Sequence, residues 1–255
     1  MSNKLSKRFT AAASSLHLGW PPKNLLGQKK MFLKKVIFDL HGPILDFNTP
    51  FLGHLSGLYG VPLDETMLDH YNMGYNARMP ITPHQFNRGL ENFGRLARGG
   101  FSDLPAKAGI VEALKQIQEA GIKLEIWTYA PGATDYSHDT LVANGTGIAQ
   151  LSTIECIQRL GIVKDVRKQV RFIKPEAKAP TMAHEHCPLI VEDHPVTAMA
   201  AGTYGNAALL VPEHYNQGIS APGVLRLDNR TDLAPAVISF FKELEEAGSL
   251  IGGGR

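Results

Sequence analysis

Polar residues end four of the short apolar runs in this chain, and they are the side chains best suited to chemistry. The four positions are Asp39, Thr128, Lys174 and the pair Glu192-Asp193. Short runs rich in Val, Ile and Phe suit strands that are buried on both faces. Ligands of open α/β sheets bind at the carboxyl ends of such strands, so we expect these side chains to border a ligand site.

The first of these runs, residues 35–38, is followed directly by Asp39 and shortly afterwards by the turn residue Gly42. A carboxylate at the end of a buried strand is rarely structural. Asp39 is therefore a candidate nucleophile.

The elements that must position these side chains alternate along the chain after Met31. Apolar runs predict strands over 35–39, 123–128, 170–173, 188–193, 207–211 and 224–227. Helical spacing predicts helices over 109–120, 151–160 and 232–247. This alternation predicts an α/β fold, with a three-layer α/β/α, Rossmann-like core, a mostly parallel sheet and helices on both faces.

Residues 47–104 interrupt this alternation with a helical pattern and almost no strand signal. Their clearest helix starts with Thr82 as N-cap and Pro83 at the first helical position. We predict a small α-helical cap domain over 47–104, inserted into a core domain that comprises residues 31–46 and 105–255.

The composition is typical of a soluble globular chain: 44% of its 255 residues are hydrophobic, enough for one substantial core and a smaller lobe. No apolar stretch reaches the roughly eighteen residues of a membrane-spanning helix, so we expect no membrane partner. A net charge of +2 gives no reason to expect a nucleic acid polymer. The chain has only two cysteines, Cys156 and Cys187, which favours a reducing, cytoplasmic compartment. Neither lies in a CxxC arrangement, which argues against metal or thiol chemistry through them.

Residues 1–30 differ from the rest, because they carry six Lys and Arg residues, no acid, and apolar residues at helical spacing. A basic, acid-free, amphipathic leader resembles a mitochondrial transit peptide, which would make the protein mitochondrial. The other interpretation is an extension that is disordered or docked on the surface of a cytoplasmic protein. Both interpretations place the start of the folded chain near Met31.

Four segments in order carry a family resemblance: Phe38-Asp39-Leu40-His41-Gly42, Ile126-Trp127-Thr128, Lys174-Pro175 and Val191-Glu192-Asp193. Together they resemble the four ordered motifs of the haloacid dehalogenase-like (HAD) hydrolase superfamily. The resemblance covers nearly everything after Met31, and it includes the helical insertion at the place where that family carries its cap. Each motif alone is weak, but four in this order and at this spacing are specific.

The resemblance implies the chemistry of a phosphatase. Asp39 would attack the phosphorus of a monoester and form an aspartyl-phosphate, which divides the hydrolysis into two easier steps. Mg²⁺ would be held by the carboxylates of Asp39 and Asp193 and by the backbone carbonyl of His41, since this ion prefers hard oxygen ligands. Thr128 and Lys174 would hold phosphoryl oxygens.

Two positions qualify that assignment. Lys178 is a rival for the lysine role, but the Lys174-Pro175 step directly after a strand favours Lys174. Phosphatases of the family usually place a second aspartate two residues after the nucleophile, as the acid that protonates the leaving group, and this chain has His41 there. An imidazole, with an unperturbed pKa of about 6.5, is competent in that role at neutral pH.

The segment 211–217, Val-Pro-Glu-His-Tyr-Asn-Gln, resembles the Tyr-Asn segment after the fourth motif in the 5′-deoxyribonucleotidase branch. We therefore predict a Mg²⁺-dependent phosphomonoesterase for a small phosphorylated metabolite, with nucleoside 5′-monophosphates as one substrate class. Two alternatives stay open because His41 replaces the usual aspartate. One is a hydrolase of carbon-phosphorus or carbon-halogen bonds, and the other is a noncatalytic HAD-like subunit anchored to a larger assembly.

Overall fold

The computed structural model describes residues 31–70, 76–96, 98–129, 147–248 and 250. The basic extension over 1–30 lies outside the described residues. Among the helices described, none has both the length and the apolar character that crossing a membrane requires.

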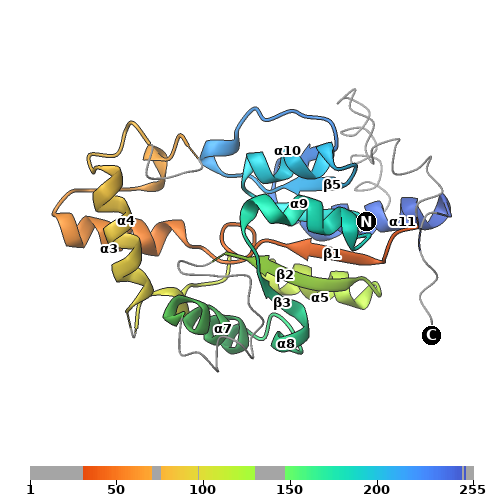
Figure 1. The fold of residues 1–255 in the computed structure, drawn as a ribbon, viewed down its shortest axis with the longest axis horizontal. Coiled ribbons are helices and arrows are strands. Elements are labelled where there is room, and N and C mark those ends of the chain that lie inside the picture. The colour runs from red at the N-terminus through yellow and green to blue at the C-terminus, as the bar shows by residue number, and fades with distance from the viewer. Residues whose placement is uncertain (1–30, 71–75, 97, 130–146, 249, 251–255) are drawn as a thin grey trace.

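A six-stranded sheet forms the centre of the molecule, with all neighbouring strands parallel and the order β3-β2-β1-β4-β5-β6 (Figure 1). The strands are β1 (Lys35–Phe38), β2 (Lys123–Thr128), β3 (Val170–Phe172), β4 (Leu189–Glu192), β5 (Ala207–Leu210) and β6 (Val224–Arg226). All six coincide with predicted strands, which confirms the α/β fold class.

The strands are apolar because both faces of the sheet are covered. On β1, Val36 and Phe38 belong to one buried hydrophobic cluster, whereas Ile37 between them belongs to another. β4 and β5 alternate between the same two clusters. Successive side chains of a strand point to opposite faces, so this alternation is what a sheet between two helical layers requires.

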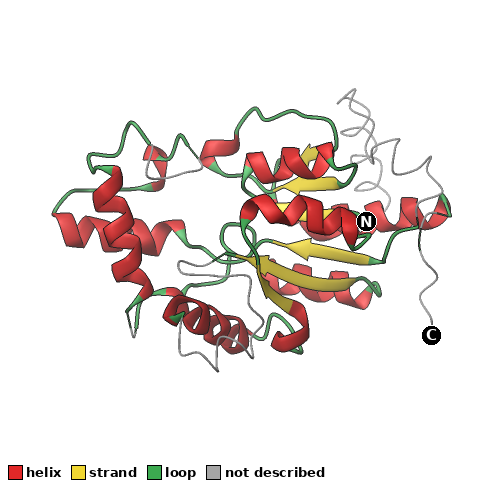
Figure 2. Ribbon diagram, in the orientation of Figure 1, coloured by secondary structure: helices red, strands yellow, loops and turns green. Residues whose placement is uncertain are grey.

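Helices cover both faces of the sheet (Figure 2). On one face α5 (Ile110–Glu119) packs against α11 (Leu233–Glu246). On the other face α9 (Pro175–His184) packs against α10 (Pro195–Thr203). Between β2 and β3 the described chain forms α7 (Ile148–Leu160) and the short α8 (Val166–Gln169).

The sequence predicts α5, α7 and α11, but it does not predict α9 and α10. Pro180 lies inside α9, and α10 consists almost entirely of small and apolar residues, so neither helix shows a clear alternation of polar and apolar positions. Both begin with a proline in the first turn, Pro175 and Pro195, where a proline is favourable. That proline is the signal that could have predicted them.

All regular elements in the described part of the insertion are helices. They are α3 (Asn48–Tyr59), η1 (Glu65–Met67), α4 (Pro83–Gly94) and η3 (Phe101–Asp103). α4 begins as predicted, with Thr82 as N-cap in a reciprocal capping box with Gln85. Phe51 meets Phe86 and Phe93 edge-on, and all three belong to the cluster that covers one face of the sheet. Figure 1 shows the insertion beyond the ends to which the strands point.

Candidate active site

Three central strands end at a common edge, and their ends carry predicted site residues. Asp39 follows β1, Thr128 ends β2, and Glu192 ends β4 with Asp193 next in the chain. β1 lies between β2 and β4, and the backbone N–H of Asp39 donates to the carbonyl of Val191 at 2.9 Å. The order of the parallel strands therefore brings these residues to one place.

Carboxylate oxygens of Asp39, Glu192 and Asp193 all lie within 4.8 Å of one another, and we call these three residues the acidic cluster. Burial, opposed by the ammonium of Lys178, raises the pKa of Glu192 to about 7. Burial and the charges of Asp39 and Glu192 raise the pKa of Asp193 well above its ordinary value. A cation would relieve this repulsion, and a set of hard oxygen donors fits a divalent ion such as Mg²⁺.

Lys178 is the cation that the structure places in the acidic cluster. Its ammonium donates to Oδ1 of Asp39 at 2.6 Å and to Oε1 of Glu192 at 2.7 Å, and only 3% of its side chain is exposed. Burial alone lowers the pKa of Lys178, but the carboxylates of Asp39 and Glu192 outweigh burial and raise the pKa above its usual value. Lys178 is therefore charged, and it compensates part of the negative charge around it.

Lys174, which the sequence favours over Lys178 for the lysine role, is not part of this arrangement. Lys174 is the N-cap of α9 and is exposed, whereas Lys178 lies one turn further along the same helix and is buried. The Lys174-Pro175 step marks the place where the helix begins. The packing of α9 on the sheet then determines which lysine reaches Asp39.

His41 lies between the acidic cluster and aromatic residues. Its Nδ1 is 3.4 Å from the hydroxyl of the buried Thr128, and its ring meets Phe47 and Phe101 edge-on, with centroids 5.5 Å and 5.4 Å away. Its Nε2 is buried and has no hydrogen-bond partner among the residues described. Burial lowers the pKa of His41 to about 4, so the imidazole is neutral at neutral pH.

A cavity of about 130 Å³ connects these groups to the surface. The acidic cluster, His41 and Lys178 border it, together with side chains from the first turns of α9 and α10. The side chain of Asp39 keeps 13% of its surface exposed, so its carboxylate is within reach of a molecule in this cavity.

Sequence reasoning underestimates two residues at this site. It expects the pair Glu192-Asp193 to border the site but gives Glu192 no role of its own. In the structure the Glu192 carboxylate is buried and accepts from Lys178. The two-residue period of β4 is the available signal, because it places Glu192 on the same side as Ile190, which faces α9 and α10. The other is Tyr215, associated from sequence with the substrate, whose hydroxyl instead donates to the Asp193 carboxylate.

Comparison by sequence finds no matching family model and no matching curated protein. Comparison of structures finds a HAD family hydrolase from Deinococcus radiodurans, solved with bound phosphate and sodium. It is 15% identical, covers 88% of this chain and 100% of its own, and has a TM-score of 0.50. A haloacid dehalogenase-like hydrolase from Streptococcus pneumoniae is 13% identical over 82% of this chain and 98% of its own, with a TM-score of 0.49. The chain thus has the fold of the haloacid dehalogenase-like hydrolases, which confirms at the level of the fold the resemblance that its four motifs predict.

Proposed function

We propose that the protein is a Mg²⁺-dependent phosphomonoesterase that uses Asp39 as its nucleophile and acts on a small phosphorylated metabolite. The observation that carries this proposal is the position of Asp39. Its carboxylate lies at the end of the central strand, borders the cavity, and belongs both to the acidic cluster and to the ion pair with Lys178. The similarity in fold to HAD hydrolases supports the same reaction class.

In this proposal the metal ligands are the carboxylates of Asp39 and Asp193 and the backbone carbonyl of His41. The bound ion supplies positive charge that neutralises the phosphoryl oxygens. The ammonium of Lys178 donates to one oxygen of the Asp39 carboxylate and holds it in a fixed direction. Thr128 offers a hydroxyl at the same edge of the sheet.

The reaction has two steps. An oxygen of Asp39 attacks phosphorus while the bond from phosphorus to the ester oxygen breaks, and the departing oxyanion takes up a proton from solvent water. Water then attacks the phosphorus of the aspartyl-phosphate, which releases inorganic phosphate and restores the carboxylate. His41, with its pKa lowered to about 4 by burial, is neutral at neutral pH and therefore poorly suited to protonate the leaving group. Esters with acidic leaving groups, such as aryl phosphates, are therefore expected to react fastest.

Nucleoside 5′-monophosphates are included among the substrates to be tested for one reason, the resemblance of the segment 211–217 to the 5′-deoxyribonucleotidase branch. Tyr215 and Asn216 both hydrogen-bond to Asp193. Their contacts explain a Tyr-Asn pair at this position without any nucleotide.

The proposal is tested by the release of inorganic phosphate from aryl phosphates, sugar phosphates and nucleoside 5′-monophosphates, with Mg²⁺ and with a chelator. Asp39→Asn is expected to reduce turnover to background. Lys178→Met is expected to lower kcat by about 100-fold or more, because a preorganised charge at the reacting centre is lost. Lys174→Met is the matched control and is expected to keep wild-type turnover, because Lys174 is exposed outside the acidic cluster.

Full turnover in Asp39→Asn would contradict the role of Asp39. Release of halide from haloacids, or cleavage of phosphonates, without turnover of any ester would favour a hydrolase of carbon-halogen or carbon-phosphorus bonds. Binding of Mg²⁺ without turnover of any substrate would favour the noncatalytic subunit.

A further inference from the structure

Asp193 is held by contacts to both its side chain and its backbone. The hydroxyl of Tyr215 donates to Oδ2 of its carboxylate. The side-chain amide of Asn216 donates to the backbone carbonyl of Asp193 at 2.9 Å and to that of Val211 at 2.8 Å. Asn216 is fully buried, so it ties the loop after β5 to the end of β4. Adjacent residues of one loop therefore fix Asp193 at two points.

The turn after the nucleophile approaches the same carboxylate. Gly42 has φ of +96°, and a Cβ at this position would overlap Oδ2 of Asp193. Glycine therefore allows the turn to close on Asp193, both through its backbone conformation and through its lack of a side chain. Oδ2 is confined between the turn at Gly42 and the hydroxyl of Tyr215.

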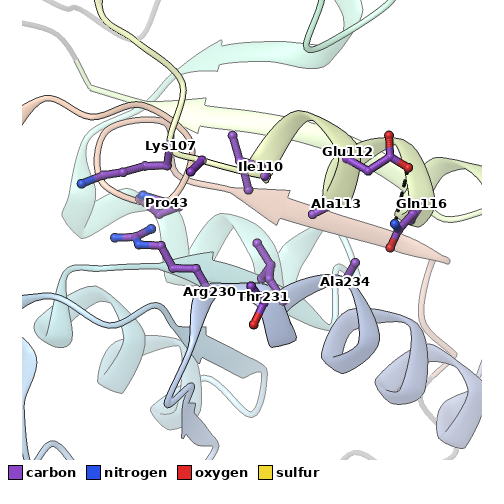
Figure 3. A pocket seen from close by; sticks show the side chains of 12 residues that line it. Pro43, Lys107, Ile110, Glu112, Ala113, Gln116, Arg230, Thr231 and Ala234 are labelled. Carbon is purple, nitrogen blue, oxygen red and sulfur yellow. Dashed lines mark hydrogen bonds between the residues drawn. The ribbon is translucent and has the colours of Figure 1, made fainter. Parts of the chain in front are cut away.

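Ion pairs hold this turn and the Tyr215 loop together. Arg230 donates to the carbonyl of Gly42 at 2.9 Å and pairs with the buried carboxylate of Glu213, two residues before Tyr215. Lys107 lies 3.7 Å from Glu213 and 3.2 Å from Asp46. Figure 3 shows Lys107 and Arg230 beside Pro43, around a second cavity of about 200 Å³ that shares no lining residue with the first. These ion pairs therefore hold in place the two segments that contact Oδ2 of Asp193, the turn at Gly42 and the Tyr215 loop.

We propose that Tyr215 is a positioning residue that orients the Asp193 carboxylate for a divalent cation. By donating to Oδ2, its hydroxyl limits rotation of the carboxylate and leaves the other oxygen to face the cation. This inference rests on the proposed function, because it assumes that the acidic cluster binds a metal ion. Hydrogen bonds that orient metal ligands contribute to affinity even though they do not touch the metal.

The competing explanation is that Tyr215 stabilises the fold only. A tyrosine hydroxyl in a partly buried position usually has a hydrogen-bond partner, whatever its role. Tyr59 provides the matched control, because its hydroxyl donates to the backbone carbonyl of Gln85 at 2.7 Å within the insertion, away from the acidic cluster. Tyr59→Phe removes the same atom and one hydrogen bond without touching Asp193.

The test is calorimetric titration of the metal-free full chain with Mg²⁺ and with Mn²⁺, for the wild type, Tyr215→Phe and Tyr59→Phe. Tyr215→Phe is expected to bind both ions about 10-fold more weakly or worse, and Tyr59→Phe is expected to bind them as the wild type does. Urea unfolding of the metal-free proteins shows whether the two variants lose comparable stability.

Wild-type affinity in Tyr215→Phe would overturn the positioning role and leave the proposed function intact. Equal losses of affinity in Tyr215→Phe and Tyr59→Phe would show that the effect follows from stability, which also overturns it. Absence of binding by the wild type would overturn both this inference and the metal site of the proposed function.

Discussion

His41 and Lys178 lie at the same site, yet Lys178 is charged at neutral pH and His41 is neutral. Two carboxylates accept hydrogen bonds from Lys178, so its charge persists despite burial. His41 has Phe47 and Phe101 against its ring, and burial dominates. Of two groups buried at one site, the one with two carboxylate partners keeps its charge, whereas for the other the effect of burial is larger and the charge is lost.

The first prediction concerns the pH dependence of stability. The unfolded chain protonates His41 below about pH 6.5, whereas burial keeps it neutral in the folded protein down to about pH 4. Stability is therefore expected to fall as the pH falls through this window, because the unfolded state then binds the extra proton. His41→Asn removes this contribution, so the free energy of unfolding of the metal-free variant is expected to change less between about pH 7 and about pH 5. Urea unfolding at the two pH values measures this, and identical pH dependence in wild type and variant would contradict it.

The elements that follow the strands bring the site together. α9 carries Lys178 back to the end of β1, and α10 begins directly after Asp193, with His194 as its N-cap. Both helices must pack closely on the sheet and its loops for these first turns to reach the site. At Gly202, near the end of α10, a Cβ would overlap the backbone carbonyl of Pro222.

Gly202→Ala is therefore expected to lower the free energy of unfolding by about 1–3 kcal/mol, because backbone atoms must move to admit the methyl group. Gly53→Ala is the matched control in α3, where the added Cβ meets nothing within 4 Å. That substitution is expected to raise stability by about 0.5–1 kcal/mol, since alanine favours the helix. Both changes are measured by urea unfolding, and a neutral Gly202→Ala would show that α10 does not pack this closely.

Across the whole molecule, contacts between distant segments hold in place the turn that follows Asp39. Arg230 donates to the carbonyl of Gly42, a residue 188 positions earlier in the chain, and it also pairs with Glu213. One hydrophobic cluster likewise extends from the sheet into the insertion, from Phe38 to Phe93. The site is thus assembled by the tertiary structure as a whole.

Arg230→Met is expected to lower the free energy of unfolding by about 1–3 kcal/mol, because it leaves the buried carboxylate of Glu213 and the carbonyl of Gly42 without this donor. Lys115→Met is the comparison, since Lys115 pairs with Glu119 at 4.0 Å and both side chains are exposed. That change is expected to stay within about 0.5 kcal/mol of the wild type. Chemical unfolding measures both, and equal effects would contradict a structural role for Arg230.

The sequence alone determined the six strands, the helices α5, α7 and α11, and the positions of Asp39, Thr128 and Asp193 at strand ends. Each strand contains an apolar run long enough to be recognised without knowledge of its neighbours. Because parallel strands end at one edge, locating the strand ends was sufficient to predict that these three residues meet. The N-cap at Thr82 can likewise be predicted from the local sequence, since its partner Gln85 is three residues away.

Only the tertiary structure decided which lysine joins Asp39 and which side chain holds Asp193. Lys178 and Asp39 are separated by 139 residues, and Tyr215 and Asp193 by 22. Lys174 and Lys178 lie one turn apart on α9, so helical periodicity does not distinguish between them. Their roles diverge because the packing of α9 against the sheet buries one and exposes the other, and that packing depends on side chains distributed along the whole chain.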